Sequence, residues 1–111
     1  ATEFQGEITY YNPALGACGY TDGDDDTIVA IPKEFWDSIS TLTSYGIDLP
    51  AHPLCNKKIT IKSGDKAATA TIHDRCDGCV GHAIDVTPKL FQDLFGSLDG
   101  GRLDCTWEIN E

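Results

Sequence analysis

Basic residues are scarce in this sequence, and their scarcity excludes several classes of partner. The chain carries 8 Lys and Arg against 18 Asp and Glu, which gives a formal net charge of -10 at pH 7. Proteins that bind nucleic acid or an anionic membrane surface need clustered basic side chains to neutralise phosphates. The basic residues here are scattered, so we expect neither nucleic acid nor a membrane as partner. Repulsion between like-charged copies also favours a monomer.

Methionine and long apolar runs are missing as well. No segment approaches the roughly 20 consecutive apolar residues that a membrane-spanning helix requires. The chain begins Ala-Thr-Glu-Phe, without an initiator methionine, a basic segment or an apolar leader. This start is typical of a secreted protein whose leader has been removed. The length of 111 residues suits one domain, so we expect residues 1–111 to form a single domain.

Cysteine, in contrast, is abundant. Five Cys in 111 residues are dense for a reducing cytosol and ordinary for a secreted domain stabilised by disulfides. Choosing the free thiol in five ways and pairing the other four in three ways leaves 15 arrangements open. Cys76 and Cys79 form a C-x-x-C pair, which is half of a zinc site or the core of a redox motif. The second pair and the βαβ frame that these sites need are not found, so we expect no metal and no other cofactor.

Short segments of alternating apolar and polar residues, separated by turn residues, predict a mainly β domain. Hydrophobic spacing predicts a helix from Lys33 to about Leu42, and Thr87 followed by Pro88 predicts the start of a second helix over Lys89–Phe95. The predicted strands are Gly6–Tyr11, Thr27–Ile31, Lys57–Lys62, Lys66–His73, Ala83–Val86 and Leu103–Ile109.

Two carboxylates offer the strongest candidate chemistry. In the segment HDRCDGCVGHAIDVTPKL, Asp74 stands at the end of one predicted strand and Asp85 lies in the next, so both face one region. Such a pair at the mouth of a small barrel can exchange protons with a glycosidic bond or accept hydrogen bonds from sugar hydroxyls. On the residues alone a structural role stays equally open, because Asp85 can also cap a turn or accept backbone N–H groups.

Other polar clusters give weaker signals. His52, His73 and His82 match no metal-ligand spacing. The acidic run Asp22–Asp26 starts like a calcium loop, but the glycine and glutamate expected at its sixth and twelfth positions are absent. We therefore expect hydrogen-bonding histidines and a solvated acidic loop.

The order of segments along the chain resembles the double-psi β-barrel domain of expansin-related proteins, specifically the single-domain fungal kind called loosenins. The resemblance runs from about Gly6 to Ile109 and rests on GEITYYNPALGACGYTDGDDDTIVAIP, HPLCNKKITI, KAATATIHDRCDGCVGHAIDVTPKLFQDL and the terminal TWEI. It implies a six-stranded double-psi β-barrel with short peripheral helices. It further implies a secreted protein that binds β-glycan (cellulose, possibly chitin or a hemicellulose) in an open groove and loosens plant or fungal walls without hydrolysis.

The resemblance also implies roles for individual residues. Asp85 is similar to the proton-donating Asp of glycoside hydrolase family 45 endoglucanases, with Asp74 beside it and Thr9 hydrogen-bonded in the same site. Asn12 takes the place of the carboxylate that serves as base in those enzymes, and an amide cannot readily deprotonate water, so we expect no hydrolysis. Further contacts with the glycan are implied for Tyr10, Tyr11, Asn12 and Tyr20.

Two alternatives stay open beside this reading. One is a small endoglucanase or a lytic transglycosylase built on the same barrel. The other is a defence or effector protein that binds a protein partner.

The cysteine pairing is implied by the same resemblance. It pairs Cys18 with Cys55 and lets Cys76 and Cys79 close locally. Cys105 is then left as a buried thiol, because the alternation of the last strand puts it on the face of Trp107.

Overall fold

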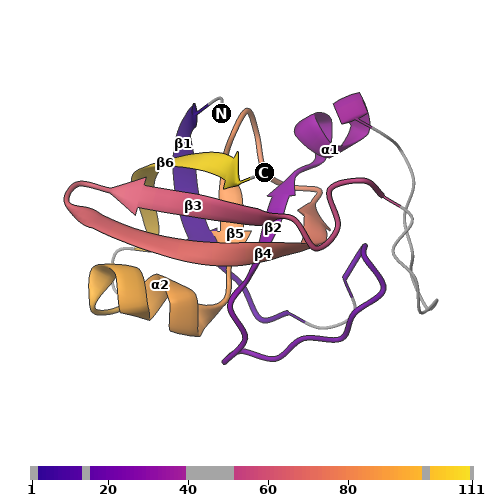
Figure 1. Ribbon diagram of the computed structural model, residues 1–111. Coiled ribbons are helices and arrows are strands. Elements are labelled where there is room, and N and C mark those ends of the chain that lie inside the picture. Colours follow the sequence, from indigo (N-terminus) through magenta and orange to yellow (C-terminus); the bar gives the residue numbers. More distant parts are fainter. Residues whose placement is uncertain (1–2, 14–15, 40–51, 99–100, 111) are drawn as a thin grey trace.

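A computed structural model describes residues 3–13, 16–39, 52–98 and 101–110 of the chain. Within these residues six strands close into a barrel in the order β1-β5-β2-β4-β3-β6, and two short helices lie outside it (Figure 1). The expectation of a mainly β, six-stranded barrel with peripheral helices is confirmed. The elements are β1 (Glu3–Tyr10), β2 (Ile28–Pro32), α1 (Lys33–Ile39), β3 (Lys58–Ser63), β4 (Lys66–Cys76), β5 (Ile84–Val86), α2 (Pro88–Phe95) and β6 (Arg102–Asn110).

The barrel combines parallel and antiparallel pairs. β1 pairs with β5 and β2 with β4 in parallel, whereas the remaining neighbours are antiparallel. The three-residue strand β5 lies between β1 and β2, so residues from opposite ends of the chain meet there. Such pairings cannot be read from local sequence, because they depend on how the sheet closes.

Local signals fix the helix ends. The Thr87 hydroxyl accepts a hydrogen bond from the Leu90 backbone N–H, and Gly96 ends α2 in the left-handed region at φ 81°. The predicted start of α2 is therefore confirmed. The other helix begins at Lys33 as predicted and is described to Ile39, while the rest of its predicted span lies outside the described residues. No helix among the described residues has the length and apolar character needed to cross a membrane.

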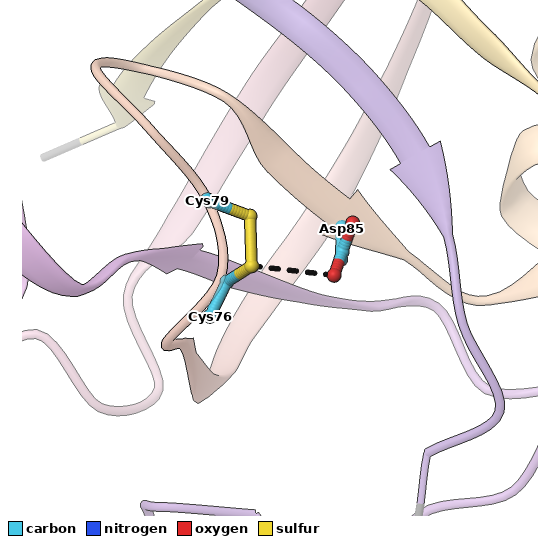
Figure 2. Close-up of side chains that lie close together, drawn as sticks. All are labelled: Cys76, Cys79 and Asp85. Carbon is cyan, nitrogen blue, oxygen red and sulfur yellow. Dashed lines mark hydrogen bonds between the residues drawn. A yellow bond between two sulfur atoms is a disulfide. The ribbon is translucent and has the colours of Figure 1, made fainter.

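Two disulfides tie the barrel together. One joins Cys18 to Cys55, and the other joins Cys76 to Cys79 in the loop between β4 and β5 (Figure 2). These are the pairs that the resemblance implies. Cys105 is a buried free cysteine.

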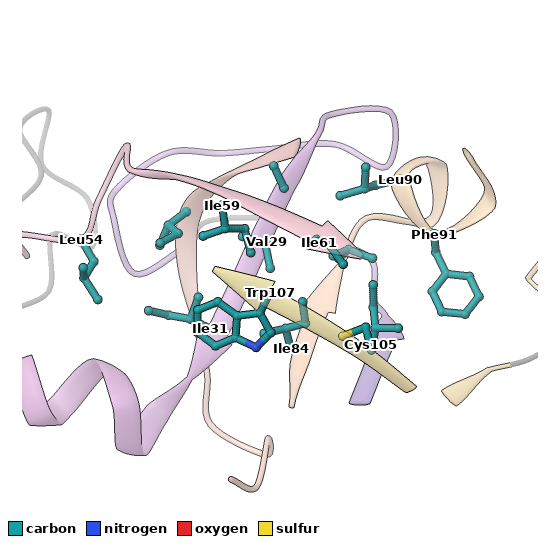
Figure 3. Close-up of a cluster of buried hydrophobic side chains, with 14 of the residues drawn as sticks. Val29, Ile31, Leu54, Ile59, Ile61, Ile84, Leu90, Phe91, Cys105 and Trp107 are labelled. Carbon is teal, nitrogen blue, oxygen red and sulfur yellow. The ribbon is translucent and has the colours of Figure 1, made fainter. Parts of the chain in front are cut away.

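The barrel interior is filled by branched aliphatic side chains packed around one indole. Trp107 of β6 is fully buried, as its place in the alternating pattern predicts, and its Nε1 donates a hydrogen bond to the His82 carbonyl at 2.9 Å. Trp36 of α1, whose environment the sequence left undecided, is also fully buried. The fully buried aliphatic residues that share this core with Trp107 include Val29, Ile31, Ile59, Ile61 and Ile84 (Figure 3). Ile8 belongs to the same core.

Candidate functional site

Sheet register brings the candidate residues into one row across five strands. Thr9 of β1 lies opposite Asp85 of β5, which lies opposite Ala30 of β2, and Ala30 in turn lies opposite Asp74 of β4. On the other side, Thr9 lies opposite Arg102 of β6. Directly opposite residues on neighbouring strands share a face of the sheet. The row is therefore Arg102, Thr9, Asp85, Ala30 and Asp74, with the small Ala30 separating the two carboxylates.

A cavity of about 480 Å³ opens above this row. The cavity is lined by residues from β1, β2, β4 and β5, from the loop that follows β4, and from the start of β6. They are Thr9, Tyr10, Tyr11, Ala30, Asp74, Arg75, Cys76, Asp77, Gly78, Cys79, Ala83, Asp85 and Arg102.

Asp85 occupies the centre of the row and is only half exposed. The Thr9 hydroxyl donates a hydrogen bond to its Oδ1, and its Oδ2 lies 3.3 Å from the Cys76 sulfur (Figure 2). Burial raises the pKa of Asp85, and the Asp74 charge raises it further, while Arg102 opposes both. Asp85 is thus held as a carboxyl group that keeps its proton to higher pH than an exposed aspartate does.

Asp74 has a different environment, because the protein itself uses both of its oxygens. Its Oδ1 accepts hydrogen bonds from the backbone N–H groups of Ala17 at 2.9 Å and Arg75 at 2.8 Å. Its Oδ2 accepts one from the Tyr11 hydroxyl at 3.2 Å. Burial raises the pKa of Asp74 and is the largest influence, which the three donors partly offset. The backbone-accepting role that the sequence left open for Asp85 falls to Asp74.

The segment that packs against Asp74 explains the glycine of the GACGY motif. A Cβ at Gly16 would stand 2.5 Å from the His73 carbonyl oxygen and 3.2 Å from side-chain atoms of Asp74. No real side chain tolerates that approach. Cys18, tied to Cys55, donates its backbone N–H to the same His73 carbonyl at 3.2 Å. The contacts of this motif with the His73 carbonyl therefore hold the end of β4, and with it Asp74, in place.

Tyr10, the last residue of β1, and the adjacent Tyr11 differ in role. The Tyr11 hydroxyl is committed to Asp74, and burial together with that carboxylate raises the pKa of Tyr11, so it remains a donor. Tyr10 lines the cavity with 37% of its surface exposed and packs on Phe91 of α2. Tyr10 is thus the aromatic ring that a ligand can reach.

Two predicted contact residues lie away from the cavity. Asn12 is exposed, and its side-chain amide donates to Asp24 at 3.1 Å. Tyr20 stacks on His73 with ring centroids 4.4 Å apart, and its hydroxyl accepts a hydrogen bond from Asn56. Neither lines the cavity, so their contact with a ligand stays a prediction.

The structure adds cavity residues that the sequence did not single out. Arg75 forms an ion pair with Asp77 at 2.7 Å, and the Arg102 Nη1 lies 3.6 Å from the Glu7 Oε1. The position of Arg102 opposite Thr9 follows from the β1–β6 register, which no local pattern encodes. Asp77 could have been found from its place inside the C-x-x-C loop, next to the candidate carboxylates.

One group among the described residues has the composition of a metal site. The Cys76 and Cys79 sulfurs and a carboxylate oxygen of Asp85 all lie within 4.8 Å of one another. Joined in a disulfide, the two sulfurs are not thiolates, and the thiolate is the form that binds metal.

Sequence comparison finds fungal relatives, while no family model matches the chain. The chain is 40% identical over 92 residues to the protein called Allergen Asp f 7 homolog of Arthroderma benhamiae, covering 80% of this chain and 28% of that protein. It is 33% identical over an alignment of 112 positions to Allergen Asp f 7 of Aspergillus fumigatus, covering 95% of this chain and 36% of that protein. The chain thus spans about a third of the length of these relatives.

Solved structures share the whole fold. Streptomyces papain inhibitor matches with a TM-score of 0.79 at 25% identity, covering 99% of this chain and 96% of the inhibitor. The expansin of Clavibacter michiganensis matches with a TM-score of 0.75 at 16% identity, covering 99% of this chain and 51% of the expansin. The fungal elicitor cerato-platanin matches with a TM-score of 0.64 at 18% identity, over 96% of this chain and 92% of the elicitor. The chain therefore has the double-psi β-barrel fold of these structures, and the resemblance to loosenins fits these neighbours.

Proposed function

We propose that this domain binds a β-linked glycan of the cell wall in the cavity centred on Asp85 and does not cleave it. The observation that carries the proposal is the row of donors and acceptors along the cavity floor: Arg102, Thr9, Asp85 and Asp74. Sugar hydroxyls both donate and accept, so a row of this kind suits them. An expansin of the same fold has been solved in complex with cellohexaose, which supports a β-glucan as the class of ligand.

The charge states in the cavity support binding without hydrolysis. An inverting hydrolase needs a carboxylate base roughly 6.5–9.5 Å from its acid, with room for a water molecule. Asp85, with its raised pKa, can serve as the acid. Asp74 already accepts three hydrogen bonds from the protein, and Asp77 is paired with Arg75. Among the described residues that line the cavity, each carboxylate other than Asp85 thus already has a protein partner.

Affinity in this cavity is expected to be low. Tyr10 is the exposed ring beside the row, and one aromatic contact contributes on the order of 1 kcal/mol beyond its area. The remaining contacts are hydrogen bonds exchanged with water, which contribute about 1 kcal/mol each. We propose millimolar to micromolar binding that becomes effective on a polymer with many repeated sites.

The setting of this function is the outside of a cell. Two disulfides in so short a chain are typical of oxidising compartments, and the sequence relatives are fungal. We propose that residues 1–111 act as one secreted, monomeric domain on cellulose, with chitin and hemicellulose as the other candidate polymers.

The test compares wild type with Asp85→Asn on filter paper, chitin and xylan. Asp93→Asn is the matched control, because Asp93 lies on α2, is exposed, and pairs with Lys89 outside the cavity. Three quantities are measured: protein bound to the polymer, reducing ends released, and mechanical weakening or dispersion of the fibres.

We expect wild type and Asp93→Asn to bind and weaken at least one polymer without new reducing ends, and Asp85→Asn to lose both effects. Release of reducing ends that depends on Asp85 would make the protein an endoglucanase or a lytic transglycosylase instead. Unchanged binding by Asp85→Asn would place the glycan elsewhere on the barrel.

A second candidate function is inhibition of a papain-like protease. The papain inhibitor of Streptomyces covers nearly the same chain length at 25% identity, and the loop after Cys79 presents Val80 with 82% of its surface exposed. A short loop with an exposed apolar side chain suits insertion into a protease cleft. If the domain inhibits papain, Val80→Asp should abolish the inhibition while Asp85→Asn retains it. Absence of inhibition by wild type would exclude this function for papain.

A further inference from the structure

We propose that the loop closed by Cys76 and Cys79 becomes a site for zinc or a similar soft divalent cation once its disulfide is reduced, with Asp85 as the third protein ligand. The proposal concerns the reduced protein and does not depend on whether the oxidised cavity binds a glycan. The C-x-x-C spacing alone supplies only half a site, and the structure supplies the missing donor from β5.

The positions of the donor atoms suit a tetrahedral centre. Zinc binds thiolate sulfur at about 2.3 Å and carboxylate oxygen at about 2.0–2.2 Å, so sulfur and oxygen ligands on one ion lie about 3.5 Å apart. The Asp85 Oδ2 lies 3.3 Å from the Cys76 sulfur (Figure 2). The Cys76 and Cys79 Cα atoms are 5.4 Å apart, and rotation of the side chains can separate the freed sulfurs to the roughly 3.8 Å that two thiolates on one ion require.

The surroundings already orient the carboxylate and leave space for adjustment. Thr9 donates to Oδ1 of Asp85, so Oδ2 is the oxygen turned toward the sulfurs. Outer hydrogen bonds of this kind fix the orientation of metal ligands. Gly78 has no atom within 4 Å of the place where a Cβ would stand, so the loop between the cysteines can shift. All three ligand residues line the cavity, so a water molecule there can complete the tetrahedron.

The reduction itself is a dithiol–disulfide exchange. A dithiol gives two electrons to the Cys76–Cys79 bond and closes to its own disulfide, leaving two thiols on the protein. Binding of the divalent cation then releases the two thiol protons. Cys79 lines the cavity and is partly exposed, whereas Cys18 is fully buried and Cys55 is 9% exposed. A mild dithiol therefore reaches the loop disulfide first.

The experiment uses the intact chain before and after mild treatment with dithiothreitol, followed by desalting without oxygen. Mass spectrometry after alkylation reports which disulfide has opened, and tryptophan fluorescence reports whether the barrel is still folded. Zn²⁺ is titrated by calorimetry, and Co²⁺ is titrated by absorbance, because cobalt bound to thiolates gives a charge-transfer band.

We expect no binding by the oxidised protein and one equivalent of metal in the reduced protein, with the thiolate band. Asp85→Asn should weaken binding by at least about 10-fold, and Thr9→Val by roughly 10-fold through loss of the outer hydrogen bond. Asp77→Asn is the matched control, because its carboxylate lies in the same loop but pairs with Arg75. It should bind as wild type does.

The proposal would be overturned if reduced and folded protein bound no metal, if Asp85→Asn and Asp77→Asn had equal affinity, or if binding survived Cys76→Ser with Cys79→Ser. Cys105→Ser removes the remaining thiol, and loss of binding there would also contradict the site. Glycan binding is measured on the oxidised protein and metal binding on the reduced protein. A negative result in one experiment therefore does not bear on the other proposal.

Discussion

Asp74 is expected to matter more for stability than for contact with a ligand. Its Oδ1 accepts the backbone N–H groups of Ala17 and Arg75, and its Oδ2 accepts the Tyr11 hydroxyl. Hydrogen bonds to a charged group contribute about 1.5–3 kcal/mol each, and a buried donor left without a partner costs about 1–3 kcal/mol. Ala17 is fully buried, so water cannot easily replace the carboxylate there.

We therefore expect Asp74→Ala to lower the free energy of unfolding by about 3–4 kcal/mol, which is a large part of the 5–15 kcal/mol typical of small domains. Asp74→Asn keeps an acceptor at Oδ1 and removes a carboxylate whose charged form burial disfavours, so we expect a loss of only about 1 kcal/mol. The measurement is urea unfolding at pH 7, followed by the fluorescence of the buried Trp36 and Trp107.

The reasoning would be refuted if Asp74→Ala unfolded within about 1 kcal/mol of wild type, or if the alanine and asparagine variants were equally destabilised. The first result would mean that water satisfies the freed donors. The second would mean that the charge of Asp74, and not its acceptor geometry, holds the segment around Ala17 in place. Either way, loss of wall-related activity in an Asp74 variant has to be compared with its stability before it is assigned to ligand contact.

Three further predictions follow from named groups. Replacing Cys18 and Cys55 by Ala should lower the free energy of unfolding in urea by about 4 kcal/mol, because their disulfide closes a 37-residue separation. Loss of the Cys76–Cys79 disulfide should lower it by less than half as much. Equal losses would contradict the loop-length argument. The folded state raises the pKa of Asp85 above the unfolded value of about 3.9, so the stability of the wild type should fall as pH rises through the folded pKa. Asp85→Asn should therefore have a higher melting temperature than wild type at pH 7 and a similar one at pH 3. A melting temperature of Asp85→Asn below that of wild type at pH 7 would contradict this sign. Burial raises the pKa of Cys105 to about 12, so Ellman's reagent at pH 8 should label this thiol only after unfolding, and fast labelling of the native protein would show that the site opens.

Local patterns were sufficient for most of the elements. Alternation in the segment ending in TWEI placed Trp107 in the core, and the Thr87-Pro88 pair placed the start of α2. Strand ends were less well placed: β1 starts at Glu3 instead of Gly6. The reason is that a strand extends as far as its neighbours pair with it, and Glu3 pairs with Glu108 of β6.

The candidate site could be predicted only in part. The pair Asp74 and Asp85 was predicted from the segment pattern and Thr9 from the resemblance, and the three residues do lie in one row. Arg102 was missed, because its place beside Thr9 is set by an antiparallel register between the two ends of the chain. The proximity of Asp85 to the C-x-x-C loop was missed for the same reason, since it depends on how β5 inserts between β1 and β2.

Local patterns were enough to predict the class of domain, the helix start at Thr87, the buried indole and the carboxylate pair, and the resemblance added the barrel fold. These features depend on the period of local patterns or on the order of motifs, and both can be recognised without knowing which segments pair in the fold. Both carboxylates line the cavity, but which of them is held by donors of the scaffold depends on how the barrel closes. Asp74 and Asp85 are the same residue type, and they differ only in what barrel closure places around them: three protein donors around one, and a hydroxyl, a sulfur and open space around the other.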